Sequence, residues 1–297
     1  MTLAPTLPPS RPMSEGRRAQ LVDGEFLFTA EDFRTIAATL HAAAGIALPD
    51  SKATLVYSRL AKRLRALGLE SFRDYCALVT GADGLDERQR MIVALTTNVT
   101  RFFREPHHFD HLRETVLPPL LAEAKRGGQV RIWSAGCSNG QEAYSIGLTI
   151  LSLAPEAADL DIRILATDID TQMLAEGRAG IYSDQIVEPI PAEFRSRWFE
   201  REAAGWRVSE RLHRLVTFNE LNLIGAWPMK RRFQAIFCRN VVIYFEEETQ
   251  AQVFSRFLPL MTPEARLYIG HSERICGPAA NRLETDGVTT YRLRSAS

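Results

Sequence analysis

The 297-residue sequence predicts an α/β protein in which an all-helical unit precedes a mostly parallel sheet covered by helices on both faces. Two observations predict this class. From Thr29 to about Val93 the apolar residues recur at helical spacing, without strand patterns between them. After about Gly127 short apolar runs alternate with helical ones, which is typical of βαβ units. We therefore divide the chain into a tail (1–24), a helical domain (25–95), a linker with a helix (96–126) and a sheet domain (127–297).

Composition excludes several classes of protein. The 36 basic residues balance the 36 acidic ones, so no net charge favours nucleic acid or a membrane surface. The four cysteines (Cys76, Cys137, Cys238 and Cys276) form no Cys-x-x-Cys pair, which argues against a zinc ribbon or a disulfide framework and suits a reducing cytoplasm. No apolar run reaches the roughly 18 residues that a membrane span requires. The tail has no secretory signal pattern and is expected to be disordered.

Helix signals organise the segment 25–95. Thr29 is expected to cap a first helix, because Asp32 follows three residues later, and Gly45 is expected to end it. The segment 50–68 carries an apolar stripe at every third or fourth residue and predicts a second helix. Two further helices are predicted over 71–81 and 86–98.

A basic cluster lies opposite that apolar stripe and consists of Lys52, Arg59, Lys62, Arg63 and Arg65. A run of this kind is usually a solvated helix face. Five basic residues are a modest footprint for nucleic acid in a neutral protein, so we predict no nucleic-acid partner. The basic cluster would bind an acidic protein surface as well as it would bind nucleic acid.

The linker segment "TTNVTRFFREPHHFDHL" brings aromatic, basic and histidine residues close together. His107 and His111 have the i, i+4 spacing of metal ligands on a helix, but no third ligand accompanies them, so no metal is predicted. Pro106 fits the first turn of an ordinary helix. Arg104, beside two phenylalanines, is a suitable clamp for a carboxylate.

The sheet domain is predicted from its alternating runs. Strands are expected within 130–135, 162–169, 233–245, 266–272 and 288–295, and helices within 141–154, 170–180 and 246–261. The aromatic and charged segment at about 186–218 is expected to be a small antiparallel β-subdomain inserted into that sheet.

Polar residues follow the strands where ligands bind in open α/β sheets, at the carboxyl ends. The glycine-rich loop Gly136–Gly140 allows close backbone approach, and Asp168 is placed to contact a ribose diol, whereas Asp170 is expected to cap the next helix. Each feature alone is common. Their order along the chain is the layout of an S-adenosylmethionine-dependent methyltransferase with a Rossmann-like sheet. Two further sets end later strands: Asn222 with Leu223, and Cys238 with Arg239 and Asn240.

A hydrolase is the alternative, because "GCSNG" also matches the nucleophile elbow, with Ser138 at its tip. Asp168 or Asp184 and then His271 would follow in the chain order of a catalytic triad. Against it, no oxyanion segment of the "HGGG" type is present and spacing singles out neither acid.

With these residues laid out, the sequence resembles the CheR-type chemotaxis receptor methyltransferases from about Thr29 to Leu293. The motifs that carry the resemblance are "TTNVTRFFRE", "WSAGCSNGQEAYS", "ATDID", "GIY", "FCRNVVIYF" and "GHSE", in family order. It implies methyl transfer from S-adenosylmethionine to glutamates on the cytoplasmic helical bundle of chemoreceptors, with S-adenosylhomocysteine as product, in the cytoplasm and without membrane insertion. A cofactor-binding regulatory protein with another partner is a further alternative.

The resemblance also implies roles for individual residues. The cofactor positions are Asn98, Thr100, Arg104, Glu142, Asp168, Asn222, Leu223, Cys238, Arg239 and Asn240. Arg104 is expected to orient the substrate carboxylate or the cofactor's own carboxylate, and Tyr244 to line the transfer site. The residues expected to dock the receptor are Lys52, Arg59, Lys62 and Arg63. Gln141 replaces the first acid of the family's "GEE". The turn "REAAGWR" is shorter than the loop that grips a receptor-tail pentapeptide in some members, so we predict independence from that peptide.

Overall fold

The computed structural model describes residues 20–295, which divide into two compact units. The helical unit holds the described residues up to Thr39 together with Leu48–Arg88, and the sheet unit holds Leu40–Ala47 and Gln89 onward. Most of the expected tail, 1–24, lies outside the described residues. Within its last five residues, Gln20 forms an isolated antiparallel bridge with Thr29.

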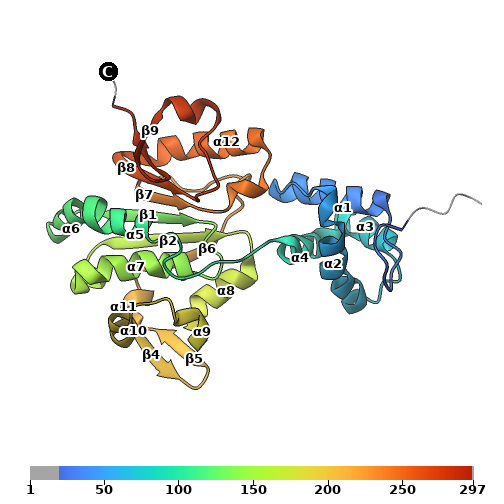
Figure 1. Ribbon diagram of the computed structural model, residues 1–297, viewed down its shortest axis with the longest axis horizontal. Helices are drawn as coiled ribbons and strands as arrows, with labels where there is room; N and C mark the ends of the chain where they lie inside the picture. The colour runs from blue at the N-terminus through green and yellow to red at the C-terminus, as the bar shows by residue number, and fades with distance from the viewer. Residues whose placement is uncertain (1–19, 296–297) are drawn as a thin grey trace, which may run out of the picture. The chain divides into compact units, whose positions relative to one another are not determined.

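The helical unit is built from α1 (Ala30–Ala44), α2 (Ala53–Leu67), α3 (Phe72–Thr80) and α4 (Leu85–Leu95), with short turns η1 (Asp50–Lys52) and η2 (Ala82–Gly84), and α1 and α4 continue into the sheet unit (Figure 1). The predicted cap of α1 is confirmed: the Thr29 backbone N–H donates to Asp32 Oδ2 at 2.9 Å, and the Asp32 N–H donates back to Thr29 Oγ1 at 3.2 Å. Gly68 ends α2 in the left-handed conformation that glycine favours, as predicted.

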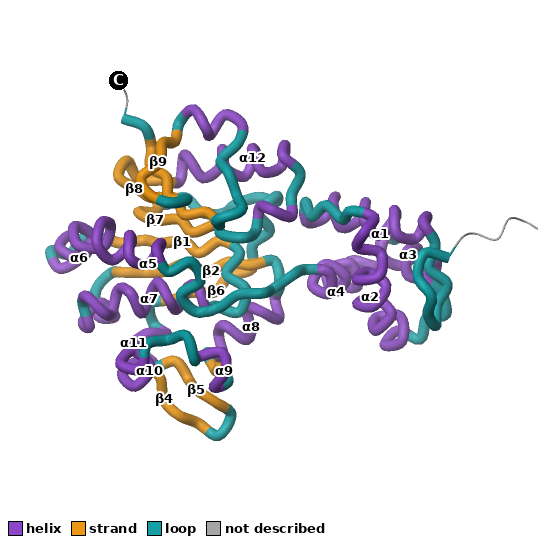
Figure 2. Tube along the Cα trace, in the orientation of Figure 1, coloured by secondary structure: helices purple, strands orange, loops and turns teal. Residues whose placement is uncertain are grey.

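The sheet unit contains a seven-stranded sheet in the order β6-β2-β1-β7-β8-β10-β9 (Figure 2). Strands β6 (Val216–Glu220), β2 (Ile162–Asp168), β1 (Val130–Ala135), β7 (Phe233–Cys238) and β8 (Met261–Ile269) run parallel. An antiparallel hairpin, β9 (Leu283–Gly287) and β10 (Thr290–Leu293), completes one edge. Each predicted strand segment contains a strand of this sheet, but the segment 233–245 is a strand only as far as Cys238. The polar sequence "LETDG" of β9 does not predict a strand.

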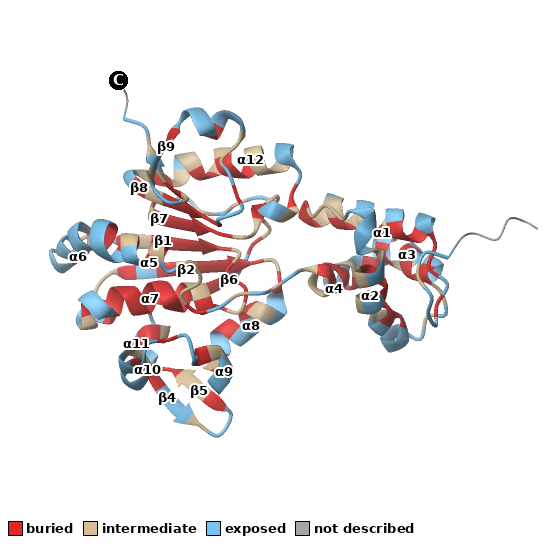
Figure 3. Cartoon of the chain, viewed as in Figure 1, coloured by how far each residue is buried: buried red, intermediate tan, exposed pale blue. Residues whose placement is uncertain are grey.

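Helices cover both faces of this sheet, and the strands between them are buried (Figure 3). Successive residues of β1 alternate between two cores: Ile132 packs in the core that contains α7 (Gln141–Leu153), and Trp133 in the core that contains α12 (Glu247–Phe257). The remaining helices are α5 (His107–His111), η3 (Leu112–Val116), α6 (Leu117–Lys125), α8 (Thr171–Ala179) and the short turns η4 (Pro155–Asp159), η5 (Val242–Tyr244), η6 (Leu258–Leu260) and η7 (Gly277–Asn281). Among the described residues, no helix combines the length and apolar character of a membrane span.

A three-stranded antiparallel sheet, ordered β3 (Ile181–Tyr182), β5 (Gly205–Val208) and β4 (Phe199–Glu202), forms the expected insertion with α9 (Asp184–Val187), α10 (Ala192–Trp198) and α11 (Glu210–His213). Its predicted bounds, 186–218, are wrong at both ends, because the insertion's sheet already includes β3 at Ile181–Tyr182. Residues 216–220 form β6 and pair in parallel with β2, because Val216 and Phe218 alternate into the main core.

Candidate functional site

The loop between β1 and α7 is fixed in a conformation that requires glycine. Gly136 has φ of +79°, and a Cβ there would lie 2.3 Å from Val241 Cγ2. The N–H groups of Gly136 and Cys137 donate to the Thr167 carbonyl oxygen of β2 at 2.8 and 2.9 Å. The loop is therefore held against the end of β2, as the close-approach interpretation expected.

Ser138 does not meet the partners of a hydrolase nucleophile. Its hydroxyl donates to the Asn98 carbonyl oxygen at 3.1 Å, not to a histidine ring. His271 Nδ1 lies 3.0 Å from Glu105 Oε1, and Asp184 is bound by Arg201 in the insertion. The hydrolase alternative is therefore not supported, because its residues are held by other partners.

Asp168 ends β2 at the carboxyl edge, as predicted. It accepts hydrogen bonds from the backbone N–H of Ser138 at 2.7 Å and of Asp170 at 2.9 Å. Burial raises the pKa of Asp168, although these N–H groups oppose that shift. Asp170 caps α8, as predicted, and its other oxygen accepts from Asn98 Nδ2 at 2.7 Å. The linker residue Asn98 therefore bonds both Ser138 and Asp170, the two residues whose backbone N–H groups bind Asp168.

A buried arginine links three segments of the site. Arg239 follows β7, its side chain is 1% exposed, and its Nη1 lies 3.1 Å from Glu142 Oε2 on the first turn of α7. Nη2 lies 3.3 Å from Glu105 Oε2 and donates to the Arg104 carbonyl oxygen. Ser134 Oγ donates to the other Glu142 oxygen at 2.7 Å. Burial raises the pKa of Glu142, and the Arg239 charge counteracts this.

The linker segment around Arg104 adopts an uncommon backbone. Phe103 and Glu105 have φ of +51° and +55°, which places two non-glycine residues in the left-handed region on either side of Arg104. The Arg104 side chain is half-buried and donates from Nη1 to the Val99 carbonyl oxygen at 2.9 Å. Among the described residues it has no carboxylate partner, so its charge is available to an incoming anion. Thr100 is half-buried in the same segment.

Glu273 is the last residue of the "GHSE" motif, but the sequence alone predicts no role for it. It is 3% exposed, and its carboxylate accepts from the backbone N–H groups of Asn240 (2.9 Å), Val241 (2.9 Å), Val242 (3.0 Å) and Gly270 (2.5 Å). Asn240 itself has φ of +59°, which asparagine tolerates better than most residues. Glu273 therefore holds the loop that carries Asn240 and leads to Tyr244. Burial raises the pKa of Glu273, with the N–H groups opposing.

The remaining predicted cofactor residues lie at adjacent strand ends. Asn222 follows β6, where its Oδ1 accepts from the Ile224 N–H at 3.1 Å and its Nδ2 donates to the Ala43 carbonyl oxygen at 2.7 Å. Leu223 is buried. Cys238 is the last residue of β7, and burial raises the pKa of its thiol well above the usual value.

The remaining predicted residues are the linker histidines and the basic residues of the helical unit. His111 bonds Tyr268 and pairs with Asp286, and the one close group of possible ligands there is Glu105, His107 and His108, within 4.8 Å of one another in the described residues. A cation in it would compete with Arg239 for Glu105. In the helical unit, Lys52 and Lys62 are exposed and Arg59 is half-buried.

Arg63 does not fit the predicted docking set, because its guanidinium already forms an ion pair with Glu87. Its Nη2 lies 2.6 Å from Glu87 Oε2 and its Nε 2.9 Å from Oε1, and Tyr75 donates to the same carboxylate. Glu87 is buried, so Arg63 serves the packing of the helical unit rather than an open surface.

The polar groups at the carboxyl edge fit a nucleoside-containing cofactor. A carboxylate stands at the end of β2 and another at the start of α7, and the glycine loop between them leaves no room for a side chain at Gly136. Arg239 Nε and Glu105 Oε2 are buried without hydrogen-bond partners in the described residues, so the network has polar capacity left for a ligand.

The sequence matches two family models: "CheR methyltransferase, SAM binding domain" over residues 98–291 and "CheR methyltransferase, all-alpha domain" over 31–96. A probable chemotaxis protein methyltransferase of Rhizobium etli is 54% identical over 257 residues, 85% of this chain and 96% of that protein. Chemotaxis protein methyltransferase 2 of Pseudomonas aeruginosa is 41% identical over 277 residues, 90% of this chain and 94% of that protein. The chemotaxis protein methyltransferase of Escherichia coli K12 is 39% identical over 271 residues, 88% of this chain and 90% of that protein.

Proposed function

Since this chain belongs to the CheR methyltransferase family, we propose that it methylates glutamate side chains of chemoreceptors, forming glutamate methyl esters. S-adenosylmethionine is its cofactor, and when bound it supplies a methyl group that the sulfonium charge makes electrophilic. The observation that carries the choice of a carboxylate substrate is Arg104, a half-buried guanidinium beside the cofactor edge that has no carboxylate partner among the described residues.

The chain's own residues have to bind and align two reactants. Asp168, at the end of β2, is proposed to bind the ribose diol of the cofactor, and Glu142, in the first turn of α7, is proposed to contact the cofactor. The proposed cofactor set is completed by Asn98, Thr100, Arg104, Asn222, Leu223, Cys238, Arg239 and Asn240. Tyr244 lies half-buried at the end of the loop held by Glu273 and is proposed to line the transfer site.

No general base is needed for this reaction, because a glutamate carboxylate is ionised at pH 7. The work of the site is alignment and exclusion of water, and such positioning contributes on the order of 7–11 kcal/mol in favourable cases. The substrate carboxylate must be held without being neutralised by a tight buried pair. Arg239 does not neutralise the substrate carboxylate, because Glu142 and Glu105 already balance its charge. The more exposed Arg104 is therefore left to orient the substrate.

The receptor is proposed to dock on the exposed basic residues of the helical unit, Lys52 and Lys62, with Arg59 beside them. Such a surface fits an acidic helical bundle in the cytoplasm. Charge reversal at both lysines is expected to lower receptor methylation at least fivefold and leave cofactor affinity unchanged, since long-range charge complementarity acts mainly on association. Arg73→Glu on α3, also an exposed charge reversal, is the matched control. Equal effects of both variants would contradict the docking site.

Independence from a receptor-tail pentapeptide is supported by the hairpin of the insertion. Strands β4 and β5 are joined by only Ala203 and Ala204, which leaves no loop to close over a peptide. Receptors with and without the C-terminal pentapeptide are therefore expected to be methylated at similar rates. Micromolar or tighter binding of the peptide in calorimetric titration would contradict this.

The proposed substrate is tested by labelling receptor-containing membranes with radioactive S-adenosylmethionine. We expect label on the receptor, and its loss when glutamates on the receptor's cytoplasmic helices are replaced by alanine. Unchanged labelling of such a receptor would exclude these side chains as acceptors.

A further inference from the structure

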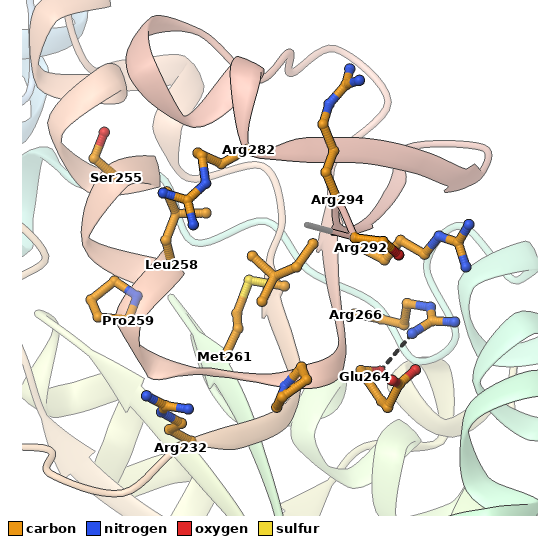
Figure 4. A pocket seen from close by; sticks show the side chains of 13 residues that line it. Arg232, Ser255, Leu258, Pro259, Met261, Glu264, Arg266, Arg282, Arg292 and Arg294 are labelled. Atoms are coloured by element: carbon orange, nitrogen blue, oxygen red, sulfur yellow. Dashed lines mark hydrogen bonds between the residues drawn. The ribbon is translucent and has the colours of Figure 1, made fainter. Parts of the chain in front are cut away.

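A cavity lies at the end of the parallel sheet that is opposite the cofactor edge. It has a volume of about 650 Å³, and five arginines line it: Arg232, Arg266, Arg282, Arg292 and Arg294 (Figure 4). It adjoins Met261, the first residue of β8, whereas the segment that contains Glu273 follows Ile269, the last residue of that strand. The ends of β8 pair with Phe233 and Cys238 of β7, and since each of these five steps advances about 3.3 Å, the two ends are about 17 Å apart. The cavity is therefore separate from the proposed methyl-transfer site.

The arginines of this cavity are only partly neutralised. Arg266 pairs with Asp286, and Arg292 with Glu284 at 2.9 Å. Arg294 donates from Nε to the Leu283 carbonyl oxygen at 3.0 Å, which satisfies one N–H but not its charge. Arg232 and Arg282 are exposed and have no ion pair among the described residues. Glu264 also lines the cavity, so three carboxylates, those of Glu264, Glu284 and Asp286, face the five arginines. The remaining excess of positive charge is local, because the net charge of the protein is zero.

The cavity also has an apolar side. Leu258, Pro259, Met261 and Leu293 are among its lining residues. Figure 4 shows the guanidinium groups of Arg232 and Arg282 on the same side as Leu258 and Pro259, with those of Arg266 and Arg292 beyond Met261. A ligand that suits both surfaces carries more than one negative group and an apolar or planar body.

We propose that this arginine cavity binds a nucleotide. All of its basic residues are arginines, whose planar guanidinium groups bind phosphate oxygens in pairs and also stack on aromatic rings. The apolar side chains would accept the base. The volume lies within the roughly 300–1,000 Å³ of small-molecule sites. A bare phosphate would leave the apolar lining unused, and an acidic peptide would bring flexible side chains whose ordering costs affinity.

The test is calorimetric titration of ATP, without magnesium, into the full chain saturated with S-adenosylhomocysteine, so that the cofactor site is already occupied. We expect one ATP per chain with a dissociation constant below 1 mM. Arg232→Ala/Arg282→Ala is expected to weaken binding at least tenfold, and each single variant to weaken it severalfold. Neither side chain has an ion-pair partner among the described residues, so folding should persist, and a thermal melt checks this. Arg126→Ala, an exposed arginine after α6, is the matched control and should bind as the wild type does.

The proposal is overturned by an absence of binding at millimolar ATP, by equal binding of ATP to the double variant, or by an equal loss of binding in the Arg126 control. Tripolyphosphate and an acidic hexapeptide are titrated in parallel. If tripolyphosphate binds as tightly as ATP, the base contributes nothing and the nucleotide assignment is wrong. If the peptide binds more tightly than ATP, the cavity belongs to a protein partner instead.

Discussion

Arg239 Nη1 lies 3.1 Å from Glu142 Oε2, and this buried ion pair joins the end of β7 to the first turn of α7. The same guanidinium contacts Glu105 and the Arg104 carbonyl oxygen, so one cation fixes the linker segment against the sheet. Removing one partner of a buried pair is costly, about 3–5 kcal/mol, because the other charge stays buried. The geometry of the cofactor edge therefore depends on this network as a whole.

Glu142→Gln is expected to lower the affinity for S-adenosylmethionine at least tenfold. The amide no longer balances the Arg239 charge, and the guanidinium moves toward Glu105. Isothermal titration measures the affinity, and Glu188→Gln, an exposed position in the insertion, is the control. Wild-type affinity in the Glu142 variant would show that the pair does not shape the cofactor site.

Arg104→Ala is expected to reduce kcat/KM for methyl transfer by well over tenfold, because the unpaired guanidinium that orients a carboxylate is lost. Arg101→Ala removes an exposed arginine from the same segment and is the matched control, with near-normal turnover expected. Rates are measured with labelled cofactor and receptor membranes. Equal rates in the two variants would remove the role assigned to Arg104.

Glu273→Gln is expected to slow turnover more than tenfold while the chain still folds. The amide NH₂ replaces an acceptor that faces several backbone N–H groups, and each unsatisfied buried group costs about 1–3 kcal/mol. The loop that carries Asn240 should relax, so kcat should fall more than the melting temperature explains. Glu248→Gln on α12 is the exposed control. A variant that loses stability but keeps kcat would mean that Glu273 only supports the fold.

The buried His108 is expected to make stability depend on pH. Burial lowers the pKa of His108 to about 3, and the charge of Arg239 adds to this, whereas the unfolded value is about 6.5. Between these values the unfolded chain binds a proton that the folded protein does not, so stability is present above about 6.5 and is lost as the pH falls. One such group contributes up to about 1.4 kcal/mol per pH unit.

Urea unfolding between pH 7.5 and 5 measures this slope in the wild type and in His108→Gln, which keeps a donor for the Val288 carbonyl oxygen. The variant should show a flatter dependence by up to one proton. Identical slopes would contradict the assigned pKa.

Much of the fold follows from hydrophobic periodicity, but pairings between distant residues do not. The β1 and β2 patterns are local, so their strands and the polar residues after them could be predicted. Strand β6 was assigned to the insertion, because only its pairing with β2 shows which sheet it joins. The partner of Arg63, Glu87, is 24 residues away, and the N–H groups of Asn240, Val241 and Val242 that Glu273 binds are 31–33 residues away. Such contacts leave no spacing pattern in the sequence.

The glycine loop shows the same limit at the site itself. A nucleophile elbow and a cofactor loop both need glycines and a sharp turn between strand and helix, so "GCSNG" is compatible with either. The hydroxyl of Ser138 bonds a backbone carbonyl oxygen, and its N–H bonds Asp168, which distinguishes the two.

The central claim is that methyl groups pass from S-adenosylmethionine to receptor carboxylates as esters. Its most direct test is to label the receptor with radioactive cofactor, treat it with base, and collect volatile methanol. Our account predicts that the label leaves the receptor as methanol, and that labelling falls sharply with Arg104→Ala but not with Arg101→Ala. Label that survives base, or an unlabelled receptor in the presence of the wild-type protein, would contradict it.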